Sequence, residues 1–107
     1  MGASAKDIIP DESAPRPVIA ELSLTSKWAL TRWEGRSDDN RPVYIRYREY
    51  GLSVQLGDVG GHPDTALFAK PWFYADDVDI VDPWTISLET VCALTGIVID
   101  CAVKQQA

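Results

Sequence analysis

Strict alternation of apolar and polar residues first marks the stretch that begins at Glu21. One side of an extended chain would carry Leu22, Leu24, Trp28 and Leu30, and the other would carry Glu21, Ser23, Thr25 and Lys27. A period of two places successive side chains on opposite faces of a strand. We therefore predict a strand with one buried face here, bent near Ser26.

A second alternating stretch predicts a β-hairpin. Its apolar positions are Val43, Ile45, Tyr47, Leu52, Val54 and Leu56. If Tyr50-Gly51 is a two-residue loop, Glu49 pairs with Leu52, Tyr47 with Val54 and Ile45 with Leu56. Every apolar residue then lies on one face, opposite a polar face, which favours this register although a longer loop remains open. The polar, glycine-containing segment 35–40 predicts the turn that precedes the hairpin.

The segments after the hairpin carry weaker patterns. Residues 57–63 are typical of a loop, and 65–69 fit either a short strand or one helical turn. Pro71 cannot donate to a central ladder, so 71–74 predicts an edge strand or an irregular segment. Val78, Ile80 and Val81 indicate a short strand among aspartates.

The clearest helix lies near the C-terminus. Ser87 stands before 88–95 as an N-cap, Glu89 is in the first turn, and Gly96 follows as the C-terminal glycine. Residues 97–99 indicate a buried strand or an extension packed on the helix. The predicted fold class is α+β, a small antiparallel meander of three or four strands with one short C-terminal helix packed on its apolar face.

The domain organisation follows from the N-terminal segment. Residues 1–17 contain three prolines and no period, which predicts a flexible tail. The remainder of the 107-residue chain, 18–107, has room for one domain with a modest core.

Charge is unevenly distributed along the chain. Six of the ten basic residues fall between Lys27 and Arg48, whereas the chain from Glu49 onward holds nine acids and only Lys70 and Lys104. Such asymmetry indicates either electrostatic partner binding or neutralisation within the fold. For the hairpin arginines we favour internal pairing with the chain's own aspartates, which would explain both clusters.

The overall composition limits the partners. A net charge of −6 disfavours nucleic acid and anionic membranes as default partners, because phosphate contacts need nearby cations. No signal peptide and no apolar run of roughly 18 residues occurs, so we expect a cytoplasmic location and no membrane partner. For Cys92 and Cys101 a disulfide stays open as an alternative, and two small buried side chains are the favoured interpretation in such a chain.

The densest chemistry lies in one acidic and aromatic segment. Its candidate partner-binding residues are Asp76, Asp77, Asp79 and Asp82 with the aromatic residues Trp72, Phe73, Tyr74 and Trp84. The aspartate spacing does not match a calcium-binding loop, and a solvated loop is the simplest alternative. Aromatic anchors with a charged rim are typical of a protein interface, so this segment predicts a partner protein with a basic surface.

A second candidate surface lies on the polar side of the hairpin. Tyr44, Arg46, Arg48 and Tyr50 interleave aromatics with arginines, as in sheets that bind single-stranded nucleic acid. A weak single-strand binder is therefore the alternative function, although the net charge argues against it.

Catalysis is the least favoured class. His62 is the only histidine, and no nucleophile elbow, zinc-protease helix motif, phosphate-binding loop or dinucleotide fingerprint occurs. We expect no enzyme activity, no cofactor and no metal. The size, acidity and lack of catalytic signature are shared by several classes of small inhibitor, including toxin-immunity proteins and phage-encoded blockers of nucleic-acid-handling complexes. A non-enzymatic protein that blocks a basic surface of its partner is the primary functional hypothesis.

Overall fold

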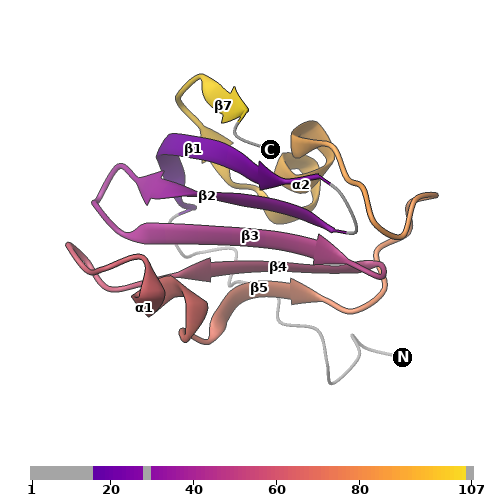
Figure 1. The fold of residues 1–107 in the computed structure, drawn as a ribbon, viewed down its shortest axis with the longest axis horizontal. Coiled ribbons are helices and arrows are strands. Elements are labelled where there is room, and N and C mark those ends of the chain that lie inside the picture. Colours follow the sequence, from indigo (N-terminus) through magenta and orange to yellow (C-terminus); the bar gives the residue numbers. More distant parts are fainter. Residues whose placement is uncertain (1–15, 28–29, 106–107) are drawn as a thin grey trace.

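A computed structural model describes residues 16–27 and 30–105 of the chain, and these form a mixed, open sheet with two short helices (Figure 1). The strands are β1 (Val18–Ser26), β2 (Thr31–Ser37), β3 (Pro42–Arg48), β4 (Gly51–Leu56), β5 (Pro71–Ala75), β6 (Val98–Ile99) and β7 (Val103–Gln105). The helices are α1 (Asp64–Leu67) and α2 (Leu88–Thr95). The predicted α+β class is confirmed at this level.

The strands β1 to β5 form an antiparallel meander, each one paired with its neighbour in the sequence. One in-register row crosses all five strands and consists of Leu24, Trp33, Ile45, Val54 and Phe73. Every residue of this row is buried. We call the face that carries it the inner face, and the opposite face the outer face.

The strand count and the purely antiparallel arrangement were wrong. Two C-terminal strands pair in parallel with β1, β6 through Val18 and Val98 and β7 through Leu22 and Val103. A strand at 97–99 was one of two predicted alternatives, and β6 confirms it. The two strands are two and three residues long, too short for a hydrophobic period to predict their parallel pairing. Figure 1 shows β7 lying beside β1 although the two are far apart in the sequence.

The sequence analysis also missed β2. The segment expected to turn contributes Gly35, Arg36 and Ser37 to β2, and the turn follows at 38–40, with Asn40 at a φ of 66°. The first strand accordingly ends at Ser26, while Trp28 lies outside the described residues. Ser and Gly favour turns locally, but pairing on both sides keeps β2 extended to Ser37.

The hairpin register differs from the predicted one by two residues. The loop is Glu49-Tyr50, both at positive φ, so that Arg48 pairs with Gly51 and Tyr47 with Leu52. Positive φ at both loop residues is the geometry whose twist matches a two-residue hairpin. A shift of two preserves which face each side chain takes, so the predicted apolar face is confirmed although its pairs are not.

The C-terminal helix is confirmed with both of its caps. Ser87 Oγ accepts a hydrogen bond from the Thr90 amide at 3.1 Å, and Gly96 takes a φ of 80°. The open choice at 65–69 resolves as a helical turn, α1, and β5 is the predicted edge strand. The strand expected at 78–81 is wrong, because this segment is irregular and its backbone bonds to the β3–β4 turn through the Val78 amide and the Tyr50 carbonyl.

A second layer covers the inner face of the sheet. Val78, Ile86, Val91 and Ile97 bury their side chains against the central row. Arg16, which falls in the predicted tail, lies over the Trp72 ring at 5.8 Å and donates to the Thr95 carbonyl at 3.3 Å. The prediction for residues 1–15 lies outside the described residues. No helix in the described part of the chain is long and apolar enough to span a membrane.

Gly35 allows β1 and β2 to approach closely, and this leads to the first testable prediction. A Cβ at position 35 would lie 1.8 Å from the Glu21 carbonyl oxygen, an impossible contact with backbone that has to move. We expect Gly35→Ala to lower the free energy of unfolding by roughly 2 kcal/mol or more. Gly51→Ala is the matched control, since its Cβ would meet nothing nearer than 3.2 Å. Urea unfolding of both variants measures the difference, and equal losses would contradict the argument.

Candidate functional site

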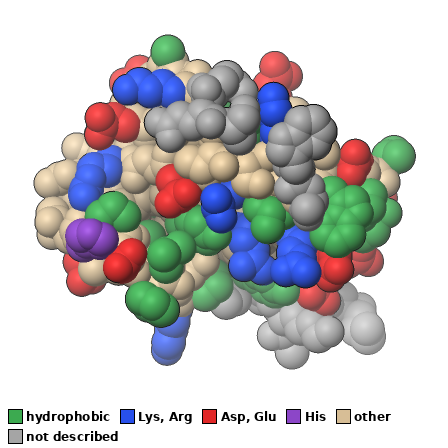
Figure 2. Space-filling view, viewed as in Figure 1, with side chains coloured by type: hydrophobic (Ala, Val, Ile, Leu, Met, Phe, Trp, Pro, Cys, Tyr) green, Lys and Arg blue, Asp and Glu red, His purple; other side chains and the backbone are tan. Residues whose placement is uncertain are grey.

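A row of polar side chains crosses the outer face of the sheet. Arg32, Arg46, Ser53 and Tyr74 are paired in register on β2, β3, β4 and β5, and we call them the arginine–tyrosine row. Arg48 lies two residues beyond Arg46 on the same face, and both are exposed. Figure 2 shows Lys and Arg side chains over the middle of the sheet, with Asp and Glu side chains around them.

The ion pairs of the described arginines are local. Arg32 lies 3.4 Å from Glu34 and also donates to Thr25 Oγ1 at 2.9 Å, while Arg41 lies 3.4 Å from Asp39. Across residues 16–27 and 30–105, neither Arg46 nor Arg48 has a hydrogen-bond or ion-pair partner. The expected pairing of these two arginines with the aspartates of 76–82 was therefore wrong.

The acidic loop, residues 76–84, is fastened to the β3–β4 turn. The Tyr50 amide donates to the Pro83 carbonyl at 3.1 Å, and the Val78 amide donates to the Tyr50 carbonyl at 2.8 Å. Further hydrogen bonds run from the Tyr47 hydroxyl to the Asp82 carbonyl and from Thr31 Oγ1 to the Trp84 carbonyl, the latter at 2.8 Å. The loop is irregular in secondary structure but held at several points along its length.

Tyr47 links the core to this loop. Its side chain is fully buried, and burial raises the pKa of its hydroxyl above the usual value. Tyr50, Asp82 and Asp77 add to the increase in this pKa, because negative charge nearby disfavours the phenolate. The neutral form is the one that donates to the Asp82 carbonyl, so environment and hydrogen bond act in the same direction.

The four aspartates take different roles. Asp82 Oδ1 accepts from the Trp84 and Thr85 amides at 2.8 and 3.0 Å, which fixes the backbone at the end of the loop. Asp76 Oδ1 accepts from the Tyr74 hydroxyl at 3.0 Å. Asp77 and Asp79 are exposed, and each stands beside the loop's own apolar residues.

The structure separates the four aromatic residues that were grouped with these aspartates. Phe73 is only 4% exposed and belongs to the core, so it is not a surface anchor. Trp72 lies where the pairing register between β4 and β5 shifts, and its side chain packs against the core and Arg16. Tyr74 joins the outer face, and only Trp84 stays with the acidic loop.

Val81 is a surface residue that the sequence analysis read differently. It was assigned to a strand, yet its side chain is 96% exposed at the centre of the acidic loop. Trp84, three residues on, is 37% exposed. Val81 follows Ile80 directly and so breaks the alternation of the preceding residues 77–80, and this break is the signal that could have separated it from a strand.

The structure places three of the four residues of the alternative, polar hairpin surface on one face. Tyr44, Arg46 and Arg48 share the outer face as predicted. Tyr50 leaves this set, because its backbone pairs with the acidic loop and its hydroxyl lies 3.4 Å from the Val81 carbonyl. Arg32 and Tyr74 take its place, brought to the same face by pairing that the hairpin alone does not contain.

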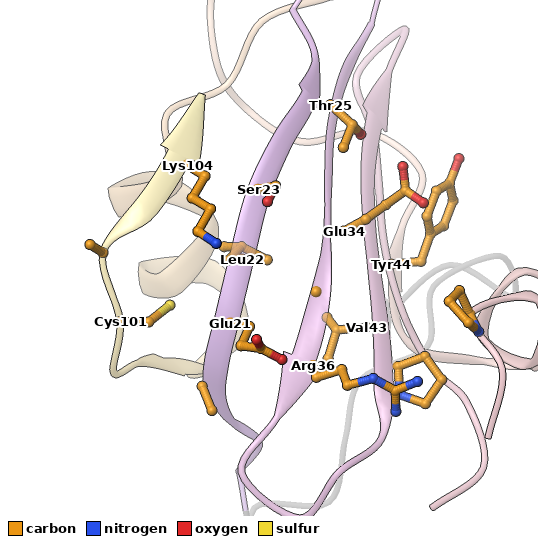
Figure 3. A pocket seen from close by; sticks show the side chains of 15 residues that line it. Glu21, Leu22, Ser23, Thr25, Glu34, Arg36, Val43, Tyr44, Cys101 and Lys104 are labelled. Atoms are coloured by element: carbon orange, nitrogen blue, oxygen red, sulfur yellow. The ribbon is translucent and has the colours of Figure 1, made fainter. Parts of the chain in front are cut away.

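A groove of about 500 Å³ lies beside the arginine–tyrosine row, over β1, β2 and β3. Figure 3 shows that Glu21 points toward Arg36 and Glu34 toward Tyr44, while the Lys104 side chain extends from β7 toward β1. Arg36 is occupied elsewhere, because it donates to the Gly61 carbonyl at 2.7 Å and to Asn40. The groove carries both signs of charge and lacks a converging set of donors or acceptors.

The remaining titratable residues do not gather into a reactive site. His62 is exposed in the 57–63 loop and lies 3.6 Å from Asp64. Burial raises the pKa values of the Cys92 and Cys101 thiols, which keeps both in the less nucleophilic form, and neither forms a disulfide. No group of three His, Cys, Asp or Glu within the described ranges could hold a metal ion.

Comparisons with protein-family models, with curated proteins and with solved structures found no match for this chain. Arguments about its function therefore rest on its own geometry.

The unpaired state of Arg46 leads to a prediction on stability. Arg46→Gln removes a charge directly opposite Arg32 without removing an ion pair, so we expect the free energy of unfolding to change by no more than about 0.5 kcal/mol or to rise slightly. Unfolding in urea at low and high salt measures this effect. Since salt screens repulsion between Arg32 and Arg46, the wild type should gain more stability from salt than the variant does. A loss of several degrees in melting temperature would contradict the assignment.

The Tyr47 hydroxyl leads to a prediction on pH dependence. Because its pKa is raised in the folded state, the unfolded state loses the proton first as pH rises, and stability must fall above about pH 10. Tyr47→Phe should cost about 1 kcal/mol at neutral pH, by losing the hydrogen bond to the Asp82 carbonyl, and should lessen the alkaline decline. Tyr44→Phe is the control, because within the described residues its hydroxyl has no partner. Identical alkaline profiles for the wild type and Tyr47→Phe would refute the role of this hydroxyl.

Proposed function

We propose that this protein is a small, acidic, non-enzymatic interaction protein that binds a partner protein with a basic surface and blocks that surface. The observation that carries the proposal is Val81, which is 96% exposed on a loop that other contacts hold in place. A large apolar side chain held in water gains nothing for the fold, whereas a partner that covers it would contribute favourable burial.

The fastening of the acidic loop supports this proposal. Binding costs less conformational entropy when the binding segment is already ordered in the free protein. Hydrogen bonds with Tyr47, Tyr50 and Thr31 hold the loop near its start, at Val78, and at its end, at 82–84, while the Val81 side chain between these points stays exposed. A disordered acidic tail would offer the same charges but would lose this advantage.

The composition of the loop favours a cationic partner. Asp77 and Asp79 are exposed on one side of Val81, and Trp84 is partly exposed on the other. Tryptophan is enriched among the residues that contribute most to protein interfaces, and a rim of like charges steers an oppositely charged partner toward it. The contact set that we propose is therefore Val81 and Trp84 as anchors, with Asp77, Asp79 and Asp82 around them.

A capture experiment followed by kinetics tests the proposal. Immobilised wild-type protein and the Val81→Ser and Trp84→Ala variants are each exposed to host extract, and proteins retained by the wild type alone are then purified. We expect either anchor variant to weaken binding of the purified partner by roughly tenfold or more. Asp77→Asn combined with Asp79→Asn should lower the association rate and flatten its dependence on salt.

The matched control changes the same number of charges elsewhere. Asp58 and Asp100 are exposed and lie outside the acidic loop, so Asp58→Asn with Asp100→Asn should leave the association rate closer to that of the wild type. Circular dichroism checks that every variant is folded. A partner that binds all of these variants equally well would exclude the acidic loop as its binding site.

A further inference from the structure

We propose that the outer face of the sheet binds single-stranded nucleic acid across its strands, through the arginine–tyrosine row together with Tyr44 and Arg48. This surface meets the acidic loop at the hydrogen bond from the Tyr74 hydroxyl to Asp76, but it does not depend on the function proposed for that loop. It also differs from the hairpin face expected from the sequence, because Tyr50 is excluded and residues of β2 and β5 are added.

The fold tolerates concentrated positive charge on the outer face of the sheet. Arg32 and Arg46 are directly opposite each other, and like charges in this position destabilise a sheet. Only Arg32 has an acidic neighbour, Glu34 at 3.4 Å, whereas no described side chain neutralises Arg46 or Arg48. The acidic loop is close enough to the β3–β4 turn to bind it, yet its aspartates are not used for this purpose. The guanidinium groups of Arg46 and Arg48 are exposed and available to an external anion.

The carboxylates around the outer face indicate the direction in which a polyanion would lie. A polyanion that followed β3 would meet Glu34 and Glu21 in the groove toward one end and the acidic loop beyond Arg48 toward the other. Along the arginine–tyrosine row, the carboxylates of Glu34 and Asp76 lie at the two ends, at 3.4 Å from Arg32 and 3.0 Å from the Tyr74 hydroxyl, and no described carboxylate pairs with Arg46. The row crosses four strands spaced about 4.8 Å apart and so spans about 14 Å, enough for a few nucleotides. We therefore place the bound strand across the sheet.

The tyrosine rings of the outer face favour nucleic acid over an acidic peptide as the ligand. Tyr44 lies beside Arg46 on β3, and Tyr74 ends the row on β5. Both rings are half-buried, so part of each remains on the surface. Tyrosine rings between arginines suit bases that stack while phosphates bind the guanidinium groups, whereas an acidic peptide offers no flat ring to stack.

The net charge of −6 limits the affinity that we expect for nucleic acid, but it does not change which surface would bind it. The acids surround the outer face and oppose the approach of any polyanion, so the affinity should be low and strongly dependent on salt. With two free arginines and a short row, we expect dissociation constants of roughly 10–100 μM at low salt.

Fluorescence anisotropy with the full chain and labelled, mixed-sequence DNA and RNA single strands of about 12 nucleotides tests the proposal. The wild type should bind single strands more tightly than the matching duplex. In Arg46→Gln combined with Arg48→Gln, the slope of log affinity against log salt should fall by about 1.4. Tyr44→Ala should weaken binding roughly tenfold with the salt slope unchanged.

The control variants separate this surface from general charge and from the acidic loop. Arg41→Gln removes one positive charge at the Asp39 ion pair, away from the row, and Val81→Ser alters the acidic loop; both should leave binding close to that of the wild type. Lack of binding up to about 100 μM at low salt would overturn the proposal. It would equally be overturned if polyglutamate bound as tightly as the oligonucleotides and Tyr44→Ala had no effect, since the face would then recognise acidic chains in general.

Discussion

The rest of the structure depends on the in-register row Leu24, Trp33, Ile45, Val54 and Phe73 across β1 to β5. Burying these five side chains on one face forces their neighbours along each strand onto the other, because side chains alternate along a strand. The arginines and tyrosines of the outer face are therefore brought together by apolar burial on the inner face. A slip of one residue in β2 or β3 would bury arginine side chains, so the register of these central strands is strongly determined.

Tyr47 extends this constraint to the surface. Its ring fills the core at the end of the sheet, and its hydroxyl reaches the Asp82 carbonyl in the acidic loop. Together with the Tyr50 backbone contacts, this bond gives an irregular segment a defined position. One residue thus connects apolar packing to the loop that carries Val81, and the loop can be exposed without being disordered.

The two charged regions meet at the hydrogen bond from the Tyr74 hydroxyl to Asp76, yet their opposite charges do not form ion pairs with each other among the described residues. Tyr50 binds the acidic loop through its backbone, next to Arg48, but the described arginines pair only with Glu34 and Asp39. Exposed ion pairs contribute little to stability, so no strong force draws these regions together. Both stay open to solvent, which is why one small domain offers an acidic, apolar loop and a cationic, aromatic face as two different surfaces.

The sequence alone determined those structural features that depend on residues close together in the chain. The alternation around Ile45 and Val54 predicted the hairpin and its faces, and Ser87 and Gly96 predicted both ends of α2, because side-chain period and capping are local. Only the tertiary structure decided that β6 and β7 pair with β1, that Phe73 is buried in the core, and that Arg32 lies opposite Arg46. These features depend on which distant strands become neighbours, and strands of two or three residues carry no pattern that specifies a partner.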